Sequence, residues 1–392
     1  MKQKITLLMK SICLLGLALS LLLVVDGRPL QAAEPIKIGV VLSVTGRGGF
    51  LGTPEKMAIT VVVDEVNRQG GLFGRPIELL FEDDQSNPTN SAIAATKLIR
   101  DKNVCSIIGA SLVVGCMAVL PICEREGVVQ LPMAPITIPH NKWVFCVPVT
   151  DYTLGLRMLK FTVDTLNARK VALLHSTDRY GMMGAQGITE RYNEYGAELL
   201  ITEKCEPTDT SMIPQLTKIK AARPDAILLY VNAVPAAVIA KNYKQLNMET
   251  IPVIGGGGIP TPEFIKLAGK VVEDGRWILF SPKDLYADKL PLDDPWRKDL
   301  YDPLMKLIKD KYGKTEWNGF YRNGYDNIRI VIEGLKIAGT DDRAALRDAL
   351  EKVEYRGFLG NFKYSPTDHN GTLGEAFEPI MIKNGEYWPY QQ

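Results

Sequence analysis

The run of four glycines from Gly255 to Gly258 is the segment whose composition most invites a chemical interpretation. A glycine-rich loop followed by Lys-Ser or Lys-Thr cradles phosphate groups with its backbone. Here Ile259 and Pro260 follow, so we interpret the run as a strand-to-loop turn where the backbone approaches another group closely. The adjacent carboxylates Asp83 and Asp84 are expected at a strand end. A solvated loop suits them better than general acid–base chemistry.

No pattern typical of catalysis or metal binding occurs. The chain lacks a GxSxG elbow, an HExxH helix, a P-loop and a dinucleotide fingerprint. Its three histidines are scattered at His140, His175 and His369, and no CxxC pair accompanies them. We therefore expect a protein that is not an enzyme and that needs no cofactor and no metal.

The number and spacing of the cysteines limit which disulfides the protein can form. Five follow residue 33: Cys105, Cys116, Cys123, Cys146 and Cys205. An odd number in an exported chain leaves at least one thiol free or bonded to another molecule. Cys116 and Cys123 are expected on one helix, about 10 Å apart, and cannot bridge each other. Buried, packed thiols are the expected state of most of them, and the sequence leaves any disulfide connectivity open.

The first 33 residues have the layout of a secretory signal peptide. Lys2, Lys4 and Lys10 precede an apolar run over residues 12–25, and Ala32 and Ala33 supply small residues for cleavage. An uncleaved membrane anchor is the alternative. We expect removal of residues 1–33 and a periplasmic or otherwise extracytoplasmic protein. The formal net charge of +1 gives no reason to expect nucleic acid as a partner.

Beyond residue 33 the chain alternates short apolar strands with amphipathic helices. Strands are expected at residues 36–42, 77–81, 104–108 and 128–131, and again at 170–175, 197–203, 225–231 and 252–255. A helix is expected over residues 183–195. Two rounds of strand–helix–strand units predict an α/β fold with two doubly wound, parallel-sheet lobes. Ligands in such folds bind beyond the carboxyl ends of the strands.

Several segments carry a recognisable family pattern. Residues 64–79 read DEVNRQGGLFGRPIEL and continue with EDDQSNP at 82–88, while HSTDRYG occupies 175–181. Together with FKY at 362–364 and NGEYW at 384–388, they resemble the leucine/isoleucine/valine-binding proteins over nearly all of the chain after the signal peptide.

The resemblance implies a type I periplasmic binding protein with three crossover segments between its lobes. The N-terminal lobe would comprise residues 34–149 and about 283–360, and the C-terminal lobe residues 150–282 and about 361–392. Such a protein closes on a small molecule and then docks on a membrane permease, as the solute-binding component of an ABC importer. We expect a monomer.

The resemblance also implies where the ligand binds. The positions fall at Val113 and Val114 after the third strand, at Ala134, Ile136 and Thr137 after the fourth, and at Tyr180, Asn232 and Gly257 in the second lobe. Arg47, Leu51 and Tyr152 are further candidates. Each has a structural alternative: Val113 and Ile136 as core residues, Tyr180 as packing at a helix start, Arg47 as a solvated charge, and Tyr152 as part of the hinge alone.

Gly257 is where the sequence departs from the family. In the amino-acid binders this loop carries an acid for the α-ammonium group of the ligand. A buried ammonium without a counter-charge costs several kcal/mol, so another acid would have to replace it, with Asp151 and Asp178 as candidates. We therefore hypothesise a ligand without an amine: an aromatic, aliphatic or oxo carboxylic acid. Its carboxylate would bind backbone N–H groups near Val113 and Ile136, helped by Thr137, Arg47 or Arg157.

Three alternatives stay open at this point. The protein is a receptor for a branched-chain or other amino acid or amide, a ligand-sensing module for a membrane regulator, or, least favoured, an enzyme. The sequence names neither the ligand nor the permease.

Overall fold

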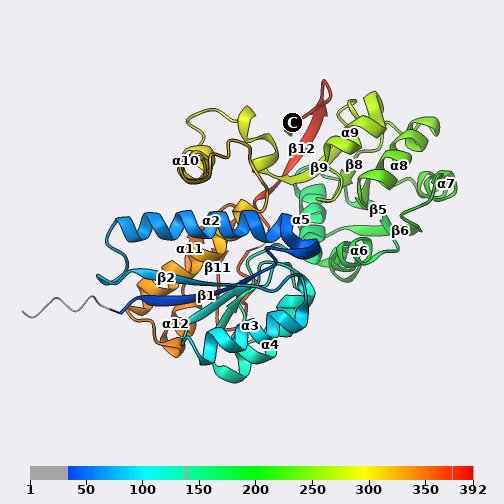
Figure 1. Cartoon of the computed structure of the whole chain (residues 1–392). Helices are drawn as coiled ribbons and strands as arrows, with labels where there is room; N and C mark the ends of the chain where they lie inside the picture. Colours follow the sequence, from blue (N-terminus) through cyan, green and yellow to red (C-terminus); the bar gives the residue numbers. More distant parts are fainter. Residues whose placement is uncertain (1–33, 137–139, 373, 392) are drawn as a thin grey trace, which may run out of the picture.

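The computed structural model describes residues 34–136, 140–372 and 374–391, which form two lobes (Figure 1). The first lobe is built on a parallel sheet of four strands in the order β2-β1-β3-β4. These strands are β1 (Ile36–Leu42), β2 (Ile77–Asp83), β3 (Ser106–Gly109) and β4 (Val129–Leu131). In Figure 1 the dark blue β1 runs from the grey N-terminal trace toward the second lobe, so its carboxyl end is directed to that lobe.

Helices from two distant stretches of the chain cover the first sheet. They are α2 (Gly49–Arg68), α3 (Pro88–Arg100), α4 (Val113–Glu126), α11 (Tyr321–Ala338) and α12 (Arg343–Leu350), with a small antiparallel pair of β10 (Glu354–Arg356) and β11 (Asn361–Lys363). Helix α10 (Asp302–Tyr312) packs on the outer side of α2. Apolar residues of β1 share one core with Ile330 and Leu335 of α11 and Leu346 of α12. This shared core explains why the chain must return to the first lobe after building the second.

The second lobe is built on a sheet of seven strands in the order β13-β12-β9-β8-β7-β5-β6. They are β5 (Lys170–Ser176), β6 (Glu198–Cys205), β7 (Ala226–Tyr230), β8 (Val253–Gly255), β9 (Trp277–Pro282), β12 (Phe377–Lys383) and β13 (Glu386–Pro389). Its helices are α5 (Asp151–Asp164), α6 (Arg179–Arg191), α7 (Ile213–Ala222), α8 (Ala233–Gln245) and α9 (Pro262–Ala268). The predicted α/β architecture with two parallel-sheet lobes is confirmed. The late strands β12 and β13 add an antiparallel edge to it.

Helix α6 begins at Arg179, four residues before the predicted start, because Asp178 caps it. The carboxylate of Asp178 accepts a hydrogen bond from the N–H of Gly181 at 2.9 Å. A glycine at position 184 disfavours a helix in isolation, but the packing against Tyr230 leaves no room for a side chain there. A Cβ there would lie 2.3 Å from the ring of Tyr230. The local cap thus sets the start of α6, whereas tertiary contact with Tyr230 explains the glycine inside it.

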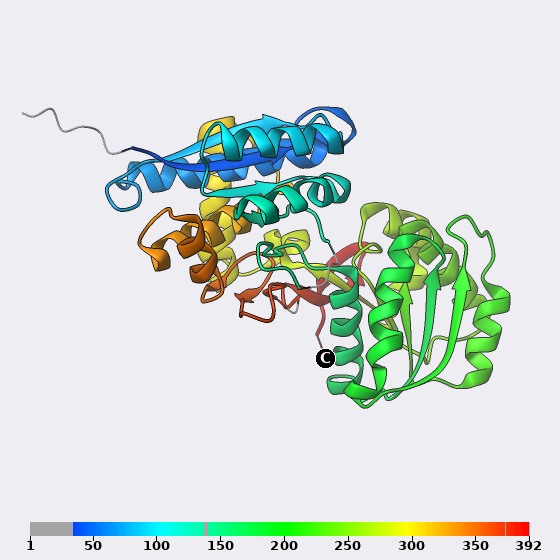
Figure 2. The same cartoon turned by 90° about the horizontal axis from the view of Figure 1, so that it is seen from below.

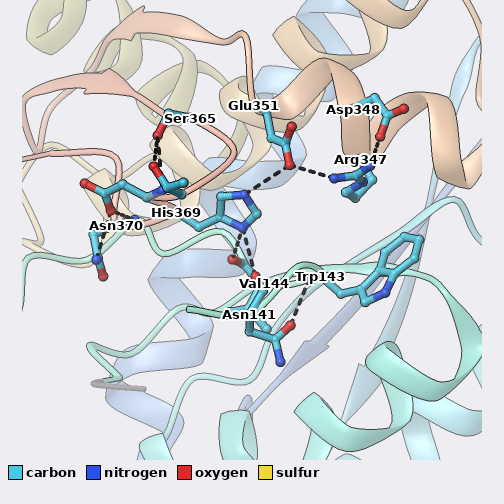
Figure 3. A network of polar contacts seen from close by, with 11 residues as sticks. Asn141, Trp143, Val144, Arg347, Asp348, Glu351, Ser365, His369 and Asn370 are labelled. Atoms are coloured by element: carbon cyan, nitrogen blue, oxygen red, sulfur yellow. Dashed lines mark hydrogen bonds and ion pairs between the residues drawn. The ribbon is translucent and has the colours of Figure 1, made fainter. Parts of the chain in front are cut away.

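Two of the segments that pass between the lobes are held together by His369 (Figure 3). The Nδ1–H of its ring donates to the carbonyl oxygens of Asn141 at 2.9 Å and Val144 at 3.1 Å, so Nδ1 carries the proton. Its Nε2 lies 3.5 Å from Oε1 of Glu351, which accepts a hydrogen bond from Arg347. The segment before α5 and the segment before β12 are thus joined to each other before they enter the second lobe (Figure 2).

All five cysteines after residue 33 are buried free thiols, as the sequence analysis predicted for most of them. Cys116 and Cys123 lie on the one helix α4. Burial raises the pKa of the Cys105 and Cys116 thiols to about 12, so both are unreactive at neutral pH. Within the described residues, no helix combines the length and apolar character needed to cross a membrane.

Candidate ligand-binding site at the strand ends

The carboxyl ends of β5, β7 and β8 bring Tyr180, Asn232 and the glycine loop together in the second lobe. The hydroxyl oxygen of Tyr180 accepts a hydrogen bond from the backbone N–H of Gly258 at 2.6 Å. A Cβ on Gly258 would lie 2.6 Å from Oδ1 of Asn232 and 2.7 Å from the Tyr180 ring. Only glycine allows these three groups to meet here. The loop therefore works as a close approach between the chain and neighbouring side chains.

A second tyrosine connects this cluster to the first crossover segment. The ring of Tyr230 lies 4.8 Å from the ring of Tyr180, centroid to centroid. The Tyr230 hydroxyl donates to Oδ1 of Asp151 at 3.0 Å. Burial raises the pKa of the Asp151 carboxyl, and the hydrogen bond from Tyr230 opposes that change only in part. Asp151 is thus already engaged with Tyr230 at this place.

The surroundings of Gly257 are apolar. A Cβ at this position would lie 3.1 Å from Cε1 of Phe377 and 3.2 Å from Cδ2 of Leu154. An acidic side chain would have to displace one of these two groups, because both distances are shorter than ordinary van der Waals contact. The position where the resemblance predicts the ammonium-binding acid is therefore surrounded by hydrophobic side chains.

The other candidate acid, Asp178, accepts hydrogen bonds from its own helix start and from a neighbouring serine. Its Oδ1 accepts the N–H of Gly181 at 2.9 Å and the hydroxyl of Ser176 at 2.7 Å. Loss of this cap would leave the start of α6 without a partner for one of its amide groups. Both acids that could replace the missing one thus already have structural partners.

Two helices that follow strands begin without a side-chain cap. Leu112 precedes α4 and Asn232 precedes α8, and neither side chain accepts a hydrogen bond from its helix. Val113 and Val114 form the first turn of α4, and Val114 is 46% exposed. Amide groups in an uncapped first turn, together with the helix dipole, favour an anion. The two valines add apolar surface beside these groups.

The loop after β4 contributes less open surface. Ala134 and Ile136 are 6% and 1% exposed and pack in a core cluster with Val144 and Cys146. Thr137 lies outside the described residues. In this conformation Ile136 is a core residue, so its side chain does not face a ligand.

Three other candidates are not gathered into the cluster. Arg47 is exposed, and Leu51 is half-buried in the first turn of α2. The hydroxyl of Tyr152 donates to Glu190 at 3.2 Å. Because Glu190 follows Tyr180 by ten residues, about 15 Å along α6, the Tyr152 hydroxyl points away from the cluster. Arg157 lies on α5, and its buried Nε has no hydrogen-bond partner among the described residues.

A buried polar network beneath the loops of the first lobe was missed by the sequence analysis. The hydroxyl of Ser111 donates to Oε2 of Glu55 at 2.6 Å, and the N–H of Ser43 donates to Ser111 at 3.1 Å. The available signal was the helical spacing that puts Glu55 on the same face of α2 as Ala58 and Ile59. That face is the buried one, so an acid there has to be buried as well.

The arrangement suits reversible binding of a small molecule. It combines uncapped helix starts, a tyrosine hydroxyl and apolar side chains at the ends of strands, which is where open α/β sheets bind ligands. Among the described residues, no group of three or more His, Cys, Asp or Glu side chains is placed to hold a metal ion.

Comparison with known proteins agrees with this geometry. A family model described as periplasmic binding protein matches residues 35–376. The chain is 24% identical over 343 residues to Leu/Ile/Val-binding protein homolog 3 of Brucella melitensis, covering 86% of this chain and 89% of that protein. It is 23% identical to a leucine-, isoleucine-, valine-, threonine- and alanine-binding protein of Pseudomonas aeruginosa, covering 88% of each chain.

Solved structures support the same fold. A putative branched-chain amino acid ABC transporter protein from Rhodospirillum rubrum matches with a TM-score of 0.78 and 22% identity, covering 91% of this chain and 99% of that one. A branched-chain amino acid transporter substrate-binding protein from Streptococcus pneumoniae, solved with isoleucine, matches with a TM-score of 0.60 and 22% identity, covering 90% and 97%. At these identities the likeness establishes the fold alone.

Proposed function

Since the chain belongs to the periplasmic binding protein family, we propose that it is the extracytoplasmic solute-binding component of an ABC importer and that its ligand is a small carboxylic acid without an amine. The ligand is an aromatic, aliphatic or oxo acid bound between the lobes. In this proposal one lobe comprises residues 34–149 and about 283–360 and the other residues 150–282 and the last part of the chain. The last part begins near β12 and not at about residue 361, because Phe362 and Tyr364 pack in the core of the first lobe. Closure of a monomer on the acid forms the surface that the permease recognises.

One observation carries the choice of ligand: among the described residues, the two acids near the second-lobe cluster already accept hydrogen bonds within the protein, and position 257 carries no acid. Gly257 is packed by Leu154 and Phe377. Asp151 accepts a hydrogen bond from Tyr230, and Asp178 caps α6. An α-ammonium group buried here would have to draw one of these acids from its present partner or lack a counter-charge, and the latter costs several kcal/mol. From the first lobe, the uncapped start of α4 would offer its amide groups to a carboxylate.

In the proposed complex each group has a stated role. The amide groups at Val113 and the backbone at Ile136 bind the carboxylate. Tyr180 and Asn232 contact the ligand from the second lobe, while Val114 and Leu51 with Ala134 supply apolar surface. Thr137, Arg47 and Tyr152 remain candidates for further contacts made on closure.

The test compares each amino acid with the acid that lacks only its amine. The chain from residue 34 is titrated by calorimetry with leucine and 4-methylpentanoate, with phenylalanine and 3-phenylpropanoate, and with benzoate. A cost of about 3 kcal/mol for the ammonium predicts at least about 100-fold tighter binding of the amine-free partner. Tight leucine binding with no binding of 4-methylpentanoate would show that the amino-acid alternative is correct.

A matched pair of asparagine variants tests the site. Asn232→Ala removes an exposed side chain at the cluster, whereas Asn193→Ala removes an exposed side chain on the short helix after α6. We expect Asn232→Ala to weaken binding of the preferred acid and Asn193→Ala to leave it unchanged. Equal affinities for the two variants would remove Asn232 from the site.

A further inference from the structure

Glu55 lies beneath the two first-lobe loops that carry the candidate ligand-binding residues. It is a residue of α2, and it is 1% exposed. Its Oε2 accepts the hydroxyl of Ser111, which is only two residues before Val113 at the start of α4. The carboxyl group of Glu55 is therefore one hydrogen bond away from the loop that presents the uncapped amide groups of α4.

The second loop is reached through α11. The side chain of Asn323 is a hydrogen-bonding neighbour of Glu55, and its Nδ2 donates to the carbonyl oxygen of Met133 at 3.3 Å. Met133 precedes Ala134 in the loop after β4, and its N–H donates to the carbonyl oxygen of Ala110 at 3.3 Å. Glu55 and Asn323 thus tie the loops after β3 and β4 to the helices behind them.

No positive charge faces Glu55 among its described neighbours. The groups around it are neutral side chains from β1, the β3 loop and α11, the thiol of Cys116 on α4, and the carboxyl group of Asp84 at the end of β2. Asp84 accepts hydrogen bonds from the hydroxyls of Ser43 at 2.7 Å and Ser91 at 2.8 Å. Burial, with a further contribution from Asp84, raises the pKa of Glu55 to about 8.

We propose that Glu55 is a positioning residue whose proton is coupled to ligand binding. With the proton bound, the neutral carboxyl group holds Ser111 and the first turn of α4 in the binding arrangement. Without it, a buried negative charge lies behind the same amide groups that receive the carboxylate of the ligand, and the two charges repel. This coupling rests on the proposed function, because it requires an anionic ligand.

Thermodynamic linkage fixes the direction of the effect. A group that must be protonated for tight binding, with a pKa near 8, lowers affinity by up to about tenfold between pH 6.5 and pH 9. Glu55→Gln is neutral at every pH and accepts the same hydrogen bond from Ser111. We expect its affinity to vary less than about twofold over this range.

The experiment measures binding of 4-methylpentanoate by calorimetry from pH 6.5 to pH 9 for the chain from residue 34, for Glu55→Gln and for the control Glu78→Gln, which alters an exposed acid on β2. We expect the control to follow the unmodified protein. If all three proteins lose affinity in parallel, or none does, the role of Glu55 is refuted while the proposed function stands. If none binds any amine-free acid at any pH, the proposed function fails first.

Should Glu55→Gln not fold, Ser111→Ala is the second variant. It removes the hydroxyl that joins Glu55 to the loop while leaving both acids in place. The proposal requires at least threefold weaker binding of 4-methylpentanoate at pH 7. Unchanged affinity would overturn it.

Discussion

The raised pKa of Glu55 also leads to a prediction about folding stability, which can be tested without a ligand. Its pKa is about 8 in the folded protein against an ordinary value of 4.5. A raised folded-state pKa means that the folded protein binds the proton more tightly than the unfolded chain does. The stabilisation is therefore complete below pH 4.5 and is lost as the pH rises toward 8.

The magnitude follows from the size of the shift. Between the two pKa values the free energy of unfolding falls by about 1.4 kcal/mol per pH unit from this group alone. From pH 5.5 to pH 7.5 this amounts to roughly 2–3 kcal/mol. Glu55→Gln cannot titrate, so its free energy of unfolding lacks this component. Other titrating groups, such as Asp326, whose pKa burial raises to about 7, are present in both proteins and cancel in the difference.

Urea unfolding followed by circular dichroism at pH 5.5, 6.5 and 7.5 measures the effect. We expect the free-energy difference between the unmodified protein and Glu55→Gln to change by roughly 2–3 kcal/mol over this range. Glu78→Gln should run parallel to the unmodified protein because its side chain is exposed. Parallel curves for Glu55→Gln as well would refute the assignment of a buried, protonated acid.

Two further predictions concern the second lobe and the thiols. Tyr180→Phe leaves the N–H of Gly258 without its acceptor, so we expect a loss of about 1–3 kcal/mol in stability and weaker ligand binding; unchanged thermal unfolding and unchanged affinity would contradict the geometry. Because the five thiols after residue 33 are buried, we expect a colorimetric thiol reagent to label fewer than one per molecule in the native state and all five in denaturant without reductant. Fewer than five in denaturant would mean that disulfides form.

The alternation of strands and helices was readable from the sequence because local rules and packing agree there. Asn87 and Pro88 illustrate this agreement: Pro88 is the first residue of α3, and the Asn87 side chain accepts the N–H of Thr89. The four-glycine turn was also predictable, since Gly258 has no room for a side chain between Tyr180 and Asn232.

The remaining features depend on contacts between distant segments. Helical spacing could have placed Glu55 on the buried face of α2, but it could not identify its partner Ser111, which lies 56 residues away. The direction of Tyr152 was likewise undetermined until α5 and α6 packed together and placed Glu190 within reach. Spacing correctly brought Ile136 to a strand end, but it could not distinguish a side chain that faces the ligand from one in the core. Fold was thus easier to predict than the orientation of individual side chains.

The packing at Gly257 has a consequence for how ligand preference changes during evolution. A mutation that introduces an acid at this position meets Phe377 and Leu154, so by itself it causes steric conflict before it offers any new contact. A smaller residue at position 377 would relieve this conflict, and Phe377 belongs to β12, more than a hundred residues further along the chain. Exchange between an amine-free acid and an amino acid therefore couples position 257 to a residue in the last part of the sequence.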